Sequence, residues 1–148
     1  MNEKIQTEKG SKEFYDLSKD YELAFAVMNL ISVEEHLAFT IARSRDEKYI
    51  DIYNEVRKLR SKYMKKIVKN SDGEMWCVSK HLLSVSMRLI ETGVKYSAED
   101  DKESAMNLFS DATDVFQLFW LIQKIGSKDN KGEKNVNVKK SKKQDSRG

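Results

Sequence analysis

The chain has 148 residues, a net charge of +3, no proline, six glycines and 34% charged residues. This length suits one domain and excludes most multidomain enzymes. The lack of proline and the few glycines disfavour β-sandwiches, collagen-like repeats and glycine-rich nucleotide folds, and they favour long helices. We therefore predict an all-α protein.

The charge is divided unevenly along the chain. Residues 127–148 carry eight Lys or Arg and three Asp or Glu, a net charge of +5, whereas residues 1–126 carry a net charge of −2. The basic tail has only two apolar residues, both valine, so burial cannot offset the entropy of ordering it. We expect residues 127–148 to be disordered, and residues 1–11 likewise.

The first predicted helix covers about residues 12–43 and the second about 45–69. In the first, apolar residues recur in two rows at helical spacing, Leu23, Val27, Leu30, Leu37 and Ile41 beside Ala24, Met28, Ile31, Ala38 and Ala42. Ser44 and Glu47 have the spacing of a capping box, which predicts the start of the second helix. Its inward row is expected to be Ile52, Val56, Leu59, Tyr63 and Ile67.

The third predicted helix covers about residues 74–96 and the fourth about 98–125. Ser71 and Glu74 repeat the capping-box spacing, and acidic residues after Ser97 suit the positive end of a helix dipole. The inward row of the third helix is expected to be Met75, Val78, Leu82, Val85 and Leu89. The fourth should bury Leu108, Ala112, Val115, Phe119 and Ile122.

The predicted connections are short, which makes consecutive helices antiparallel. We therefore predict an antiparallel up-down-up-down four-helix bundle over residues 12–126, with an extended three-helix array as the alternative. Six residues lie near the consensus positions of a tetratricopeptide repeat: Leu89, Gly93, Tyr96, Ala105, Phe109 and Ala112. The last two helices thus resemble one hairpin of that family over about 30 residues, without the second copy that a solenoid needs.

Polar residues are expected in a layer in the middle of the bundle, with Glu34, Glu35, Arg88 and Asp111 at a similar depth and His81 and Asp114 one to two turns deeper. Carboxylates removed from water need a cation, a metal or hydrogen-bond donors. One interpretation is an ion-pair network in which Arg88 is the partner of the acids. The other interpretation is a site that binds a metal or a small ligand, and such a site could catalyse hydrolysis. The Glu-x-x-His spacing of di-iron bundles is missing, so we favour the ion-pair network.

The sequence contains no convincing catalytic or metal-binding motif. Cys77 and His81 are four residues apart and form half of a zinc site, but His36, the other histidine, is expected several turns away. No nucleophile elbow or phosphate-binding loop is present. We assign no catalytic residue, no metal ligand and no cofactor.

The second predicted helix has a basic surface that could engage a polyanion. Its members are Arg57, Lys58, Lys62, Lys65 and Lys69, and no acid lies between Glu55 and Asp72. Together with the basic tail, such a row suits nucleic acid or another acidic partner. A solvated helix face that only aids solubility is the alternative.

Large aromatic residues gather late in the fourth predicted helix, at Phe116, Phe119 and Trp120. They exceed what one buried stripe needs, so we expect a self-association or partner interface there. We predict a non-enzymatic interaction or adaptor protein, with a metal- or ligand-binding bundle as the alternative. The single cysteine and the lack of a charge-free apolar run predict a cytoplasmic chain without a membrane span.

Overall fold

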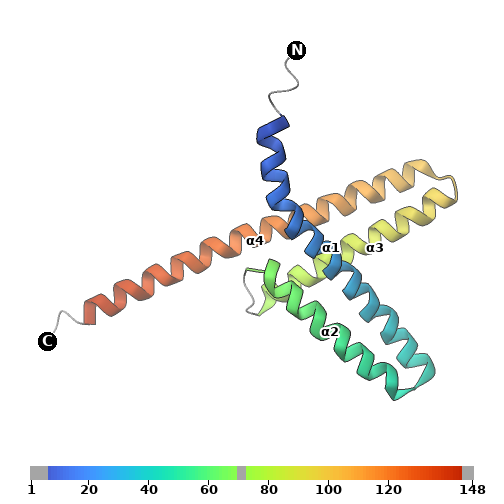
Figure 1. Ribbon diagram of the computed structural model, residues 1–148, viewed down its shortest axis with the longest axis horizontal. Coiled ribbons are helices and arrows are strands. Elements are labelled where there is room, and N and C mark those ends of the chain that lie inside the picture. The colour runs from blue at the N-terminus through green and yellow to red at the C-terminus, as the bar shows by residue number, and fades with distance from the viewer. Residues whose placement is uncertain (1–6, 70–72, 145–148) are drawn as a thin grey trace, which may run out of the picture. The chain divides into compact units, whose positions relative to one another are not determined.

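The structure is a computed structural model that describes the backbone of residues 7–69 and 73–144 and the side chains of residues 19–69 and 73–126. Four helices make up the fold (Figure 1): α1 (Thr7–Ser44), α2 (Glu47–Ile67), α3 (Glu74–Ala98) and α4 (Lys102–Gln144). No strand occurs in the described backbone, so the predicted all-α class is confirmed.

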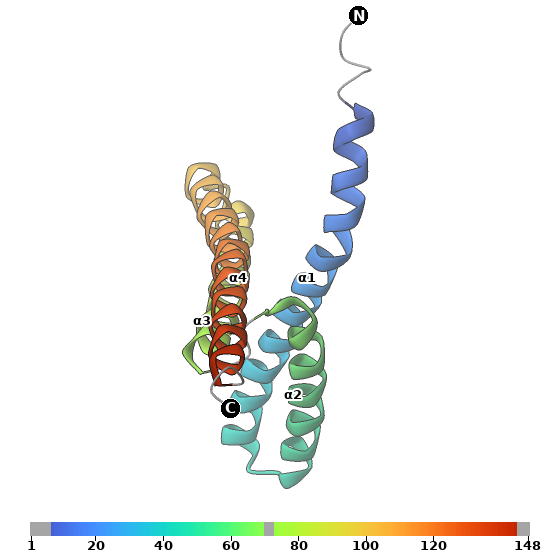
Figure 2. The same cartoon turned by 90° about the vertical axis from the view of Figure 1, so that its left-hand side faces the viewer.

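The four helices belong to two compact units of consecutive residues, 1–67 and 68–148. Within the first unit α2 runs back along α1, and within the second α4 runs back along α3 (Figures 1 and 2). Each unit is therefore an antiparallel helical hairpin. Closure of all four helices into one up-down-up-down bundle stays a prediction.

Both hairpins turn through a residue with a left-handed backbone and then an aspartate that caps the next helix. Arg45 and Asp100 have φ values of 56° and 61°. The Asp46 carboxylate accepts a hydrogen bond from the Lys48 backbone N–H at 3.0 Å, which satisfies a donor in the first turn of α2. Asp101 accepts one from the Ser104 N–H at 3.1 Å in the same way.

The helix starts predicted from Ser44 and Ser97 are therefore wrong by a few residues. Ser44 is the last residue of α1, and its hydroxyl accepts a hydrogen bond from the Asp46 N–H at 3.3 Å. Helix α3 continues through Ser97 to Ala98. In each hairpin an aspartate next to the turn caps the helix in place of the predicted residue, because a carboxylate is a strong acceptor for the free N–H groups. The other predicted cap, formed by Ser71 and Glu74, stays a prediction, because Ser71 lies outside the described residues.

The first hairpin buries the middle of the α1 rows, including Ala24, Val27, Met28 and Ile31. Among the buried residues of α2, Ile67 agrees with the predicted inward row, whereas Arg60 and Met64 were not predicted to face inward. Ile52 is 50% exposed and Leu59 45% exposed, so two members of the predicted inward row face water in large part.

The second hairpin packs small residues of α3 against α4. Helix α3 buries Ser79, Leu83, Ser86 and Gly93, where the sequence predicted larger apolar residues, and Met75 and Val85 are exposed. The Ser86 hydroxyl donates a hydrogen bond to the Ala112 carbonyl at 2.9 Å, so the two helices approach closely. A Cβ atom at Gly93 would lie 2.7 Å from the Phe109 ring. Small side chains at these positions permit this approach.

The two predicted disordered ends lie mainly outside the described side chains. The backbone of α1 begins at Thr7 and that of α4 ends at Gln144, so the helices extend beyond the predicted starts and ends. The disorder of residues 1–11 and 127–148 stays a prediction.

Candidate functional site: the basic face of α2

A buried ion pair sets the orientation of α2 in the first hairpin. The Arg60 guanidinium donates two hydrogen bonds to the Glu34 carboxylate, from Nε at 2.9 Å and from a terminal nitrogen at 3.0 Å. Their side chains are only 6% and 8% exposed. Two parallel bonds satisfy both carboxylate oxygens, so the pair tolerates removal from water.

The predicted partner of Glu34 was Arg88, and this assignment is wrong because Arg60 makes both bonds. The prediction that Glu34 would be buried and paired is confirmed. Sequence reasoning sought the partner of the acids at Arg88 and did not name Arg60 as that partner. Its spacing was the available signal, since Arg60, Met64 and Ile67 lie on one side of a helix.

The other predicted members of the polar layer belong to different units, Glu35 to the first and His81, Arg88, Asp111 and Asp114 to the second, so their meeting in one layer stays a prediction. In the second hairpin His81, Asp111 and Asp114 are exposed and Arg88 is half-buried, while Glu35 of the first hairpin is half-buried. Among the described residues, no group of three or more His, Cys, Asp or Glu is placed to hold a metal ion. Cys77, beside His81, is exposed as well.

The C-terminal half of α2 presents a row of cations to water, which we call the basic face. It consists of Arg57, Lys58, Lys62, Lys65 and Lys66, all exposed. Lys69 of the predicted surface is exposed too, but it follows the end of α2 and belongs to the second unit. Because Arg60 points inward to Glu34, the remaining cations of this segment are displayed on the outside of the first hairpin.

Glu55 borders the basic face at its N-terminal side. Its carboxylate accepts a hydrogen bond from the Lys58 ammonium at 2.9 Å, and this contact raises the pKa of Lys58. Lysine is already charged at physiological pH at its ordinary pKa, so this contact does not change the charge of Lys58 there. Lys62 lies 5.5 Å from the centre of the Tyr63 ring, within the range of a cation–π contact.

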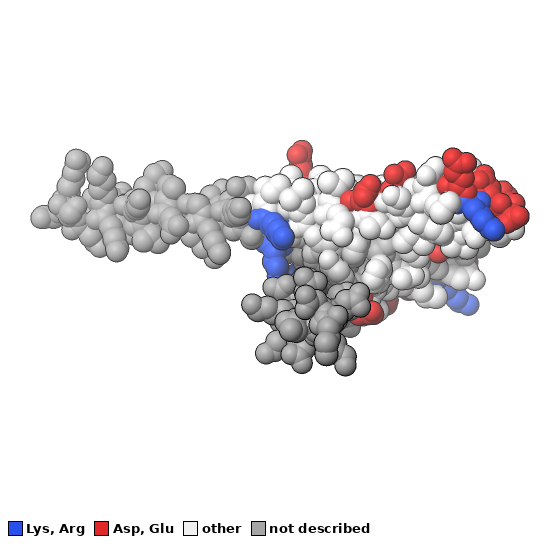
Figure 3. Space-filling view, turned by 90° about the horizontal axis from the view of Figure 1, so that it is seen from above, with Lys and Arg blue, Asp and Glu red and all other residues white. Residues whose placement is uncertain are grey.

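The acidic residues of the second hairpin gather at the turn between α3 and α4. Figure 3 shows this red cluster, whose exposed members are Glu99, Asp100, Asp101 and Glu103. Lys102 lies among them, 3.9 Å from the Asp100 carboxylate. A polyanion is repelled by such a cluster, so the basic face of α2 is the better anion surface.

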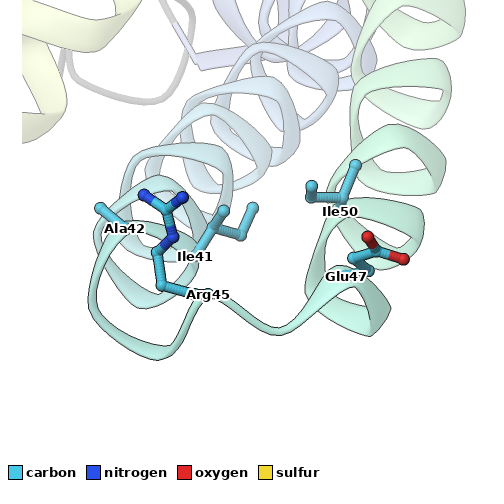
Figure 4. A pocket seen from close by; sticks show the side chains of 5 residues that line it. All are labelled: Ile41, Ala42, Arg45, Glu47 and Ile50. Atoms are coloured by element: carbon cyan, nitrogen blue, oxygen red, sulfur yellow. The ribbon is translucent and has the colours of Figure 1, made fainter.

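A pocket of about 280 Å³ lies at the turn between α1 and α2. Figure 4 shows the residues that line it: Ile41, Ala42, Arg45, Glu47 and Ile50. Ile41 and Ile50 point toward one another across the space, and Arg45 folds back beside α1. With one guanidinium and one carboxylate, these lining residues do not supply the ligand set of the predicted metal or hydrolytic site.

The aromatic residues expected at an interface lie inside the chain instead. Phe119 is fully buried, Phe116 is buried, and Trp120 is half-buried. The Trp120 ring packs edge-on against both phenylalanine rings, with centroids 5.9 and 4.9 Å apart. These three rings therefore serve as core, and the predicted apolar surface patch does not form from them.

One segment meets the length and composition of a membrane span, which corrects the expectation that none would. It is Lys19–Ser44, within which an 18-residue window reaches a mean hydropathy of 1.3. The core helix of a soluble protein and a signal sequence meet the same criteria. The segment includes Glu34, whose ion pair with Arg60 fits a helix packed against protein.

Comparison of the chain with protein-family models, with curated proteins and with solved structures finds no match. The arguments about function therefore rest on the residues described above.

Proposed function

We propose that this chain is a non-enzymatic binding protein that holds a polyanion, such as nucleic acid, against the basic face of α2. The observation that carries the proposal is the row of five exposed cations on one helix, with no acid after Glu55 in α2. Such a row binds phosphates by releasing their counterions. The binding that follows is salt-sensitive and weakly specific for sequence.

Rigid presentation of the cations supports this proposal over a merely soluble surface. Arg60 and Glu34 hold α2 in one orientation about its axis, so the basic face keeps its direction. A free thiol at Cys77 fits a reducing compartment, and a cytoplasmic location is part of the proposal.

The test is binding of the full chain to a fluorescent DNA duplex and to a single-stranded RNA, measured by anisotropy between 50 and 200 mM salt. If three to five phosphates are contacted, the logarithm of the duplex affinity falls with the logarithm of salt concentration with a slope of about −3 to −4.5. An affinity that does not change with salt contradicts the proposal.

The decisive variant removes three charges from the basic face: Arg57→Gln, Lys58→Gln and Lys65→Gln. It should lower the slope by about three and weaken binding at low salt at least tenfold, since each phosphate contact contributes separately. The matched control is Lys95→Gln with Lys102→Gln and Lys124→Gln, three exposed lysines of the second unit. Equal losses in both variants would mean that net charge alone binds the polyanion.

A further inference from the structure

A second side of α2 carries an apolar row that the first hairpin leaves open. Its members, which we call the α2 row, are Tyr49, Ile52, Val56, Leu59 and Tyr63. Tyr49, Ile52 and Leu59 are exposed, and Val56 and Tyr63 are half-buried. Successive members are three, four, three and four residues apart, which is the spacing of a coiled-coil seam.

The α2 row is distinct from the side of α2 that packs within the hairpin. Leu59 precedes Arg60, so their side chains point about 100° apart around the helix. Arg60 is buried on Glu34, whereas Leu59 is 45% exposed. A helix that is apolar on two sides, one of them open, has room for a second partner helix.

The charges beside the α2 row fit a second copy of the same helix. Apart from Lys48, the charged residues from position 47 to 55 of α2 are acidic, namely Glu47, Asp51 and Glu55, and its C-terminal half is basic. Antiparallel pairing about a two-fold axis brings the acidic part of one copy against the basic part of the other. We propose that the α2 row is the self-association surface of this protein, and that two copies of α2 pair there in antiparallel orientation.

The row itself defines the register of this pairing. In an antiparallel seam Val56 lies opposite Leu59 of the second copy, and Ile52 lies opposite Tyr63 of the second copy. This register places Glu55 beside Lys62 of the second copy, and the symmetry repeats the contact. Glu55 exchanges its exposed contact with Lys58 for the new one, a change of small cost because exposed ion pairs are weak.

Parallel pairing lacks these charge contacts. There, the residue opposite Glu55 would be Arg60 of the second copy, and that guanidinium is already buried on its own Glu34. Antiparallel pairing also leaves Arg57, Lys58 and Lys65 pointing away from the seam. The inference therefore does not depend on the proposed polyanion binding.

The experiment is sedimentation velocity of the full chain at concentrations from about 1 µM to 1 mM, a range that covers weak interfaces of small area. We expect a reversible monomer–dimer equilibrium. Leu59→Asp, which puts a charge in the seam, should raise the dimer Kd at least about 100-fold. The matched control is Val94→Asp, an exposed valine of α3, which should leave the Kd unchanged.

A charge exchange tests the orientation with little effect on the fold. Lys62→Glu places two like-charged contacts in the dimer and should raise the Kd about tenfold. Adding Glu55→Lys to this variant restores both contacts with reversed sign, and the Kd should return to within about threefold of the starting value. Circular dichroism checks that each variant keeps its helices.

Three results overturn the proposal. One is a chain that stays monomeric over the whole range, as it would if another protein or a lipid surface covers the row. Another is a Kd that Leu59→Asp leaves unchanged. The third is a double variant that is no better than Lys62→Glu alone, which rules out the antiparallel pairing. Because the charge variants leave the apolar row intact, the proposal stays testable even if the aspartate variant unfolds.

Discussion

The buried pair of Glu34 and Arg60 predicts an unusual pattern of stability changes. Removal of one partner, by Arg60→Met or by Glu34→Leu, leaves a charge that is at least nine-tenths buried without its two hydrogen bonds. Each single variant should lose about 3–5 kcal/mol of unfolding free energy, because an uncompensated buried charge is costly.

The double variant Glu34→Leu with Arg60→Met should recover most of this loss. Two apolar side chains of similar volume remove the desolvation cost along with the attraction, so the double variant should lie within about 1–2 kcal/mol of the original chain. The resulting coupling energy between the two positions is at least about 3 kcal/mol, at the upper end of measured pairs.

Urea unfolding provides the assay, with two optical signals. Both tryptophans, Trp76 and Trp120, belong to the second unit, so their fluorescence reports that hairpin, whereas circular dichroism reports all helices. The single variants should produce an early loss of helix signal that precedes the tryptophan transition. Single variants that cost less than about 1 kcal/mol, or losses that simply add in the double variant, would refute the reasoning.

Three further variants test other parts of the structure. Asp46→Ala removes the α2 cap and should cost about 1 kcal/mol in urea unfolding, whereas the neighbouring Ser44→Ala should cost much less. Gly93→Leu drives a side chain into the Phe109 ring and should cost about 1–3 kcal/mol, seen as an earlier tryptophan transition; unchanged stability would show that the helices are not in close contact there. Glu55→Gln removes the acid beside the basic face and should tighten duplex binding by about threefold at 50 mM salt, an effect that must vanish at high salt if it is electrostatic.

The sequence predicted the helices far better than it predicted which side of each helix is buried. All-α class and four helices follow from composition and spacing, and both are confirmed. The prediction of the inward side of α2 was wrong, because it followed the hydrophobic pattern, which favours Leu59. Glu34 on the facing helix requires a cation, and Arg60 turns inward to bind it. A pairing between residues on different helices does not appear in the periodicity of either one.

The prediction of the buried side of α3, in the second hairpin, was wrong for a different reason. Hydrophobic periodicity selected Val78, Leu82 and Val85, but the buried side of α3 includes the small residues Ser79, Ser86 and Gly93. Small side chains let two helices approach closely. Hydrophobicity scales give serine and glycine little weight, so the periodicity did not select them. Gly93 and Phe109 are both among the residues that carry the resemblance to a tetratricopeptide hairpin, and a Cβ atom at Gly93 would lie 2.7 Å from the Phe109 ring.

The candidate site was predicted only in part. Arg57, Lys58, Lys62 and Lys65 are exposed on α2 as expected. The polar layer depended on all four helices sharing one interior, which turn counting assumes and the sequence does not supply. We expected α4 to carry more aromatic residues than the core needs, but these residues pack around the buried Phe119 ring.

Construction from consecutive residues has a consequence for how the chain folds during synthesis. Within the first hairpin, the buried contact between Glu34 and Arg60 joins residues only 26 apart in the chain. Proteins with such local contacts fold in microseconds to milliseconds. A ribosome adds about 5–20 residues per second, so residues 1–67 can complete their hairpin seconds before the last residue of α4 is made. The first hairpin thus needs no later segment of the chain to begin folding.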